Sequence, residues 1–162
     1  MFKKMLVPLD GSEIAAKVLP KVVELAKTFK AKVTLFHACY SGVGAFAGEG
    51  TPGTIKAAEA QEKKFCETFL AKTGKDLKDK GLDVDWACQD GVPAREIIAY
   101  AQNKGYDLIV LGTHGAGEVA WYMGAVADKV ATHATVPVLL FRTLQFKAPL
   151  LKEVYSTVPG VS

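Results

Sequence analysis

Short apolar runs alternate along this chain with stretches whose apolar residues recur at helical spacing, and this alternation limits the fold more than any other feature. The apolar runs predict strands at 4–10, 32–40, 82–89, 107–112 and 136–142. The stretches between them predict helices at 14–29, 55–80, 93–103 and 125–133. Because strands joined through helices pair in parallel, we expect an α/β domain with helices on both faces of an open, parallel five-stranded sheet.

The first predicted helix carries its own start signal and an interruption. Ser12 is the natural N-cap, and Asp10 and Glu13 lie close to the positive end of the helix dipole. Pro20 lies inside the stretch 14–29 and off its apolar stripe. Proline removes a backbone donor and crowds the preceding turn, so we expect the helix to kink there.

The segment 111–130, LGTHGAGEVAWYMGAVADKV, follows the fourth predicted strand and carries four glycines. Glycines between a strand and a helix allow backbone N–H groups to approach an anion. In a doubly wound sheet of order 3-2-1-4-5, the first and fourth strands flank the point where ligands bind, beyond the carboxyl ends of the strands. We therefore expect the turn at Asp10 and this glycine segment to face each other.

Composition argues for one cytoplasmic domain without a nucleic-acid or membrane partner. The 20 basic and 17 acidic residues are interspersed, so no basic patch marks a nucleic-acid surface. No apolar stretch approaches the roughly 20 residues of a membrane span, and the start shows no signal peptide. The three cysteines form no CxxC pair, which predicts reduced thiols. Cys39 and Cys88 end neighbouring predicted strands, so a redox pair is the alternative to two small packing residues.

Four motifs together resemble the universal stress protein family. They are MLVPLDGSE near the start, GVPAREII at 91–98, DLIVLGTHG at 107–115 and the final helix followed by VPVLLFR. The resemblance assigns 1–142 to a universal stress protein-like domain and 143–162 to a C-terminal extension. It implies a Rossmann-like, adenine nucleotide alpha hydrolase-like sheet of order 3-2-1-4-5, and a homodimer joined along 136–142. An exposed apolar edge strand there would also favour pairing on its own.

The resemblance also implies where an adenine nucleotide would bind. Pro8 and Leu9 match the segment beside adenine and ribose, and Asp10 is placed to accept from a ribose hydroxyl. Gly115 matches a glycine near the phosphates. The full set of implied nucleotide contacts is Pro8, Leu9, Asp10, Ala38, Leu111, Gly112, His114, Gly115, Gly124, Ala125 and Val126.

The phosphate half of the motif departs from the family. Nucleotide-binding members carry G-x2-G-x9-G-[ST], whereas only eight residues, 116–123, separate Gly115 from Gly124 here, and Ala125 replaces the hydroxyl residue. We therefore predict weak binding of ATP, ADP or AMP with little preference for ATP, and Mg²⁺ only together with ATP. The function predicted is a stress-response sensor or regulator. The alternative is a nucleotide-free dimeric scaffold that acts through protein contacts.

Several candidate residues have simpler explanations. Gly112 and Gly115 would also serve as a tight strand-exit turn, and Asp10 would also stabilise the first helix. His114 is expected at the solvent edge of a turn, whereas His37 is expected as a hydrogen-bonded core histidine. Trp121, Tyr122 and Met123 either join the core or fill the phosphate space; these alternatives stay open.

The sequence offers no catalytic constellation and no metal-ligand spacing, so we expect at most slow ATP hydrolysis. A glycine-rich stretch at 41–54 is predicted to form a mobile loop that could close over a bound ligand. The tail 143–162 is expected to pack on the sheet or on a neighbouring chain.

Overall fold

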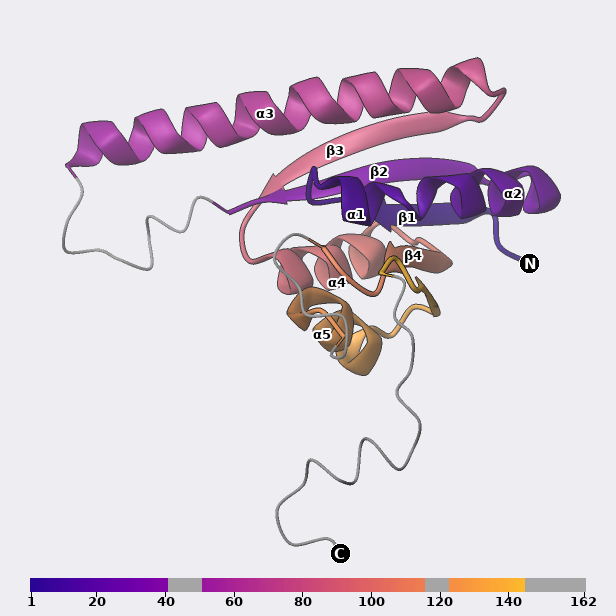
Figure 1. Cartoon of the computed structure of the whole chain (residues 1–162). Coiled ribbons are helices and arrows are strands. Elements are labelled where there is room, and N and C mark those ends of the chain that lie inside the picture. Colours follow the sequence, from indigo (N-terminus) through magenta and orange to yellow (C-terminus); the bar gives the residue numbers. More distant parts are fainter. Residues whose placement is uncertain (41–50, 116–122, 145–162) are drawn as a thin grey trace, which may run out of the picture.

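The computed structural model describes residues 1–40, 51–115 and 123–144, which form a single parallel sheet flanked by helices (Figure 1). The sheet order is β3-β2-β1-β4-β5, as predicted, and the described neighbours pair in parallel. The elements in chain order are β1 (Lys4–Pro8), α1 (Glu13–Ala16), α2 (Leu19–Phe29), β2 (Lys32–Cys39), α3 (Pro52–Asp79), β3 (Val84–Asp90), α4 (Pro93–Asn103), β4 (Leu108–Gly112), α5 (Ala125–His133) and β5 (Val138–Phe141).

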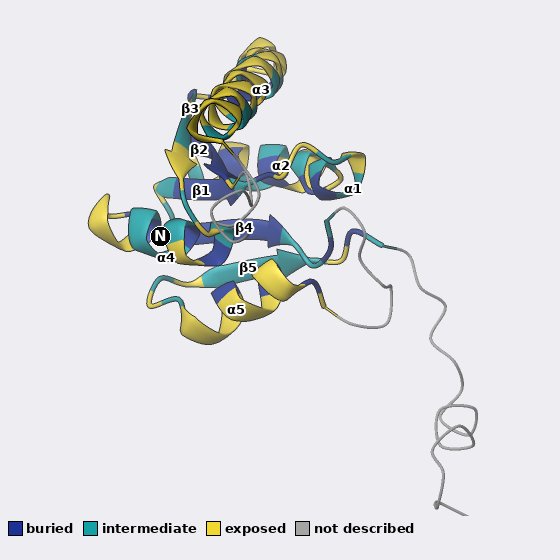
Figure 2. Ribbon diagram, turned by 90° about the vertical axis from the view of Figure 1, so that its left-hand side faces the viewer, coloured by how far each residue is buried: buried dark blue, intermediate teal, exposed yellow. Residues whose placement is uncertain are grey.

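Helices cover both faces of the sheet and create two cores, which confirms the predicted layers. The core under α2 and α3 includes Leu35, whereas the core under α4 and α5 includes its chain neighbour Phe36. Successive side chains of a strand point to opposite faces, so a central strand must be apolar at every position. This explains why β1 and β4 are almost wholly buried while the edge strand β5 is half-buried throughout (Figure 2).

The single kinked helix expected over 14–29 is wrong, because the structure divides it into α1 and α2. Pro20 has no N–H to donate to the carbonyl of Ala16, where α1 ends. The second helix starts afresh with Val18 as its N-cap, and Pro20 lies in its first turn, where the missing donor costs little. The proline therefore marks a boundary between helices.

Other boundaries differ from the sequence prediction by a few residues. The first strand ends at Pro8, and the last strand shortens to Val138–Phe141. Helix α3 begins at Pro52, and Thr51 is its N-cap. The last residues of the loop predicted at 41–54 therefore belong to the helix. The remainder of that loop, 41–50, lies outside the described residues, as do 116–122 and the tail from 145 onward. No helix in the described ranges is both long enough and apolar enough to cross a membrane.

The prediction of three reduced cysteines is wrong, because Cys66 and Cys88 form a disulfide that ties α3 to β3. Cys39 is a free, buried thiol. The alternative of a redox pair between Cys39 and Cys88 is wrong as well. Their strands are neighbours, but α3 packs across β2 and β3 and brings Cys66 to Cys88. Helix packing of this kind cannot be deduced from cysteine spacing.

We predict that reducing this disulfide lowers the free energy of unfolding by about 3 kcal/mol, because the bond closes a loop with a sequence separation of 22 and restricts the unfolded chain. Urea unfolding with and without a dithiol reductant measures the change. The Cys66→Ala/Cys88→Ala variant is the control, since its urea midpoint should not change when the reductant is added. An unchanged midpoint for the native chain would contradict the prediction.

Candidate functional site

A cavity of about 150 Å³ lies beyond the carboxyl ends of β1 and β4, at the switch point of the sheet. Every residue that the sequence assigned to the nucleotide site lines it, with the exception of Ala125. Those residues come from β1, β2, β4, the turns after β1 and β4, and the start of α5. The complete lining is Pro8, Leu9, Asp10, Ala15, Phe36, His37, Ala38, Pro93, Ile97, Leu111, Gly112, Thr113, His114, Gly115, Gly124, Val126 and Ala127.

Sequence reasoning missed the part of the wall that helices supply. Pro93 and Ile97 of α4 reach the cavity because this helix packs on β2, and Ala15 reaches it from α1. The only sequence signal for these residues is the apolar face of each helix, which marks core positions equally well. Thr113 is one of the two unspecified positions of the G-x2-G motif, so the motif assigns no contact to it.

Asp10 and Gly115 meet at the mouth of the cavity, which confirms that the two loops face each other. A Cβ added at residue 115 would fall on Oδ2 of Asp10, so this approach requires glycine. The other carboxylate oxygen, Oδ1, accepts from the backbone N–H of Ser12 at 2.9 Å and from its hydroxyl at 2.6 Å. Ser12 in turn accepts from the N–H of Ala15 at 3.1 Å and caps α1, as predicted. The first turn of α1 therefore fixes the orientation of Asp10.

His37 is a hydrogen-bonded core histidine, as expected, and it also lines the cavity. The residue is 7% exposed. Nδ1 lies 2.8 Å from the carbonyl oxygen of Leu9, and Nε2 lies 3.0 Å from Oε1 of Glu62 on α3. Phe69 packs edge-on against the ring. The histidine therefore connects the end of β1 to α3 and holds one wall of the cavity in place.

His114 is buried, so the expectation that it lies at a solvent edge is wrong. Its Nδ1 lies 2.7 Å from the hydroxyl oxygen of Thr113. The hydroxyl of Thr143 accepts from the backbone N–H of His114 and donates to its carbonyl, both at 3.1 Å. Thr143 is itself 4% exposed. Thr143, the first residue of the predicted C-terminal extension, thus covers the turn at His114. The sequence alone had predicted that this turn is exposed to solvent.

The turn after β4 closes on the start of α5 through the backbone. The N–H of Gly124 donates to the carbonyl of Thr113 at 2.8 Å, and this bond brings Gly124 to the cavity. Gly124 is the N-cap of α5, and no side chain caps the helix. Ala125 is exposed and outside the lining. The start of α5 therefore presents backbone groups without a side-chain hydroxyl.

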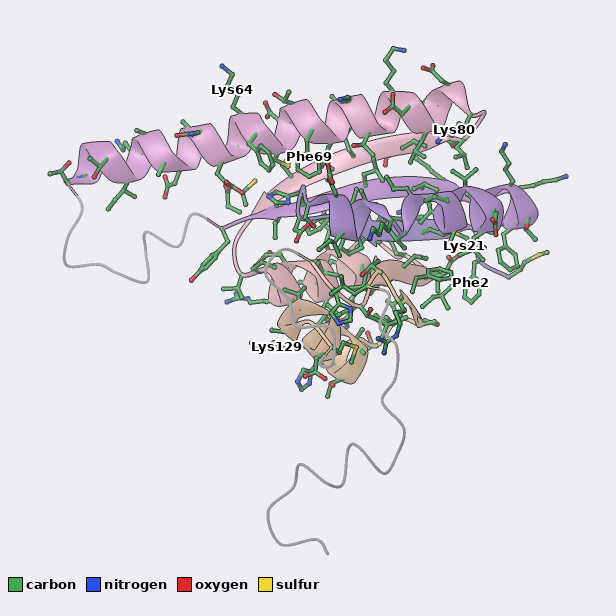
Figure 3. The ribbon with its side chains drawn as sticks, viewed as in Figure 1. Phe2, Lys21, Lys64, Phe69, Lys80 and Lys129 are labelled. Atoms are coloured by element: carbon green, nitrogen blue, oxygen red, sulfur yellow. A yellow bond between two sulfur atoms is a disulfide. The ribbon has the colours of Figure 1, made fainter. Side chains whose placement is uncertain are left out.

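The cavity is apolar inside and carries no cationic side chain among its described lining residues. Its polar side chains are those of Asp10, His37, Thr113 and His114. Lysines are plentiful elsewhere, for example Lys64 on α3, which points away from the sheet, and Lys129 on α5 (Figure 3). The site has the chemistry to enclose a flat apolar ring and to accept hydrogen bonds at its mouth.

The fold and the site together define a class of protein. It is an open, doubly wound α/β domain with a small apolar cavity at its switch point. A family model described as the universal stress protein family matches residues 1–142. The chain belongs to the universal stress protein family.

Two curated relatives are similar over most of their length. The chain is 33% identical to Universal stress protein YxiE of Bacillus subtilis over 150 residues, which cover 88% of this chain and all of the relative. It is 31% identical to Universal stress protein MJ0531 of Methanocaldococcus jannaschii over 143 residues, which cover 88% of this chain and 83% of the relative.

Solved structures share the fold. The universal stress protein UspA from Lactobacillus plantarum superimposes with a TM-score of 0.72 at 21% identity and covers 87% of this chain and 98% of its own. A universal stress protein in complex with cAMP gives 0.58 at 21% identity, with 88% and 98% covered. The universal stress protein from Archaeoglobus fulgidus in complex with dAMP gives 0.57 at 21% identity, with 86% and 97% covered.

We predict that Thr143→Val lowers the free energy of unfolding by about 1 to 3 kcal/mol, because it leaves two backbone groups of His114 without their partner in a buried place. Urea unfolding measures the loss. Thr132→Val is the matched control, since Thr132 is exposed on α5 and its hydroxyl bonds within its own helix. The control should change stability by less than about 0.5 kcal/mol. Equal effects of the two substitutions would show that Thr143 does not hold the turn.

Proposed function

We propose that this universal stress protein binds adenine nucleotides weakly at the β1–β4 cavity, acts in the cytoplasm and works there as a sensor or regulator of the stress response. The observation that carries the proposal is the assembly of Pro8, Asp10, Ala38 and Gly112 around one apolar cavity. Pro8, Ala38 and Gly112 come from three strands, and Asp10 comes from the turn after β1. The resemblance assigns the nucleoside to these positions. Their convergence supports a ligand site over a simple strand-exit turn.

The size of the cavity favours binding of the base alone. A cavity of about 150 Å³ admits a single aromatic ligand, whereas sites that enclose drug-sized ligands measure about 300 to 1,000 Å³. An adenine ring would insert between Ala38 and Leu111, which are both buried. The ribose would then lie at the mouth beside Asp10, whose carboxylate accepts hydrogen bonds from hydroxyl groups.

The phosphate groups would add little binding free energy in this arrangement. No lysine or arginine is among the described lining residues, and Asp10 brings negative charge to the mouth. The start of α5 offers backbone N–H groups but no hydroxyl at Ala125. Each missing hydrogen bond to a charged phosphate is worth about 1.5–3 kcal/mol. This supports similar affinities for AMP, ADP and ATP, with Mg²⁺ bound only as a companion of ATP.

Two relatives of known structure support an adenine ligand. One universal stress protein is in complex with cAMP, and the protein from Archaeoglobus fulgidus is in complex with dAMP. Each of these ligands has one phosphate group. Such ligands agree with a site that binds the nucleoside and makes few contacts with phosphate groups.

The proposed sensing role depends on a short connection between the cavity and the sheet edge. The N–H of Thr113 donates to the carbonyl of Phe141 on β5 at 2.8 Å, and Thr143 holds both backbone groups of His114. A ligand that orders the turn 112–115 would therefore also order the end of β5. If β5 is the dimer edge, nucleotide occupancy is transmitted to the partner surface.

We expect Ala38→Leu to weaken AMP binding by at least about tenfold, because the larger side chain would occupy the space for adenine. Isothermal titration calorimetry measures the affinity. Ala60→Leu is the matched control, since Ala60 is exposed on α3 and far from the lining in sequence. Circular dichroism checks that both variants fold, and Ala38→Val replaces the larger variant if it does not.

Equal AMP affinity for Ala38→Leu and the native chain would place any ligand outside this cavity. A native chain that binds no adenine nucleotide would contradict the proposal and favour the scaffold alternative.

We also propose a homodimer joined along β5, whose outer edge has no strand partner among the described residues. Alternate backbone groups of β5 bond to β4, as the bond from Ile109 N–H to Pro137 oxygen shows, so Val138 and Leu140 direct theirs to the open edge. Light scattering at micromolar concentration should give a molar mass of twice 17.3 kDa. Leu140→Pro removes an outward donor and should yield a folded monomer. A monomeric native chain would refute the dimer.

A further inference from the structure

Three cysteine sulfur atoms gather under α3, outside the lining of the nucleotide cavity. The Sγ atoms of Cys39, Cys66 and Cys88 all lie within 4.8 Å of one another. Cys39 is 7% exposed and Cys66 is fully buried, whereas Cys88 is half-buried. The cluster is therefore shielded from water on most sides, and a small reagent or ion can approach it past Cys88.

Regular structure positions each of the three sulfurs. Cys39 is the last residue of β2, Cys88 lies on β3, and Cys66 lies on α3. The register of the two strands pairs His37 with Cys88 and Cys39 with Asp90. Phe69, one turn of α3 after Cys66, lies between this helix and the sheet (Figure 3). The backbone therefore keeps the three residues together whether or not two of them are bonded.

The surroundings of the cluster are negative. The carboxylates of Asp90, Glu62 and Glu67 act electrostatically on the Cys39 side chain, and Lys63 acts in the opposite direction. Carboxylates near the three sulfurs favour a bound cation by Coulomb attraction. A metal ion supplies the positive charge that this thiol lacks, and a coordinating thiol loses its proton.

We propose that the reduced chain binds one Zn²⁺ ion through Cys39, Cys66 and Cys88, and that the Cys66–Cys88 disulfide closes this site. Thiolates prefer Zn²⁺ to harder ions, and tetrahedral Zn–S bonds of about 2.3 Å place ligand sulfurs about 3.8 Å apart. All three sulfurs lie within 4.8 Å of one another. Once the Cys66–Cys88 bond is reduced, its two sulfurs must move apart to reach that spacing, and Cys39 needs only a small side-chain movement. An oxygen ligand, from water or a nearby carboxylate, completes the tetrahedron.

The chain cannot hold the Cys66–Cys88 disulfide and the Zn²⁺ ion at the same time, because a sulfur in a disulfide is not a thiolate. A low-molecular-weight dithiol opens the site: the Cys66–Cys88 bond breaks and gains two electrons and two protons, while the dithiol becomes a disulfide. Zn²⁺ then displaces the thiol protons, which pass to solvent. This inference does not depend on nucleotide binding, since none of the three cysteines lines that cavity.

Cobalt titration tests the site, because Co²⁺ replaces Zn²⁺ in such sites and gives a thiolate-to-cobalt charge-transfer absorption. The full chain, reduced with a phosphine that does not bind the metal and kept anaerobic, should take up one Co²⁺ per chain with this absorption. Added Zn²⁺ should abolish it. The oxidised chain should show neither the absorption nor the stoichiometric uptake.

Cys39→Ser is the decisive variant, because it retains the disulfide pair and removes only the third sulfur. After reduction it should bind Co²⁺ at least about tenfold more weakly and with lower charge-transfer intensity. The proposal is overturned if the reduced native chain shows no charge-transfer absorption, or if Cys39→Ser matches it in affinity and spectrum. Loss of the native circular dichroism on reduction, even with Zn²⁺ present, would overturn it as well.

Discussion

The pairing of β1 with β4 at the centre of the sheet is the constraint on which the rest of the site depends. Met5 lies opposite Leu108 and Leu6 opposite Ile109, so the two strands end at the same edge. The chain leaves each of them in a polar turn, one at Asp10 and the other at Gly112–Gly115. Because both strands are buried on two faces, a shift of their register would expose apolar side chains and is strongly disfavoured. The distance between the turns is therefore set by the core.

Contacts at this edge are interdependent. Gly115 lies against Asp10, Asp10 is held by Ser12, and Ser12 caps α1. On the other side, Thr143 holds the backbone of His114, and a Cβ at Gly112 would meet the Thr143 side chain at 2.5 Å. A side chain added at Gly112 or Gly115 would therefore displace the residue that lies against it. The same property would let a ligand at the cavity influence β5.

The sequence predicted those features that follow from periodicity and from the family motifs. Alternating apolar runs were enough for the number of strands and for parallel pairing, and the strand order came with the resemblance. The turn at Asp10 and the glycine segment were paired correctly because the ends of parallel strands share an edge.

Features that depend on packing between distant segments could not be predicted. The disulfide needs α3 laid across β3, the burial of His114 needs Thr143, and the wall at Ile97 needs α4 seated on β2. No spacing rule in the sequence encodes these contacts. Pro20 is a different case, because its missing backbone donor predicted a kink. In the structure one helix ends before the proline and a second helix begins.

The proposed function requires that the cavity recognise the nucleoside and that the altered β4–α5 connection contribute little to phosphate binding. Calorimetric titration of the native chain with adenosine, AMP and ATP, each with and without Mg²⁺, tests it most directly. We expect all three to bind weakly, with affinities within about tenfold of one another, a spread of about 1.4 kcal/mol. ATP binding more than about a hundredfold tighter than adenosine and dependent on Mg²⁺ would contradict it.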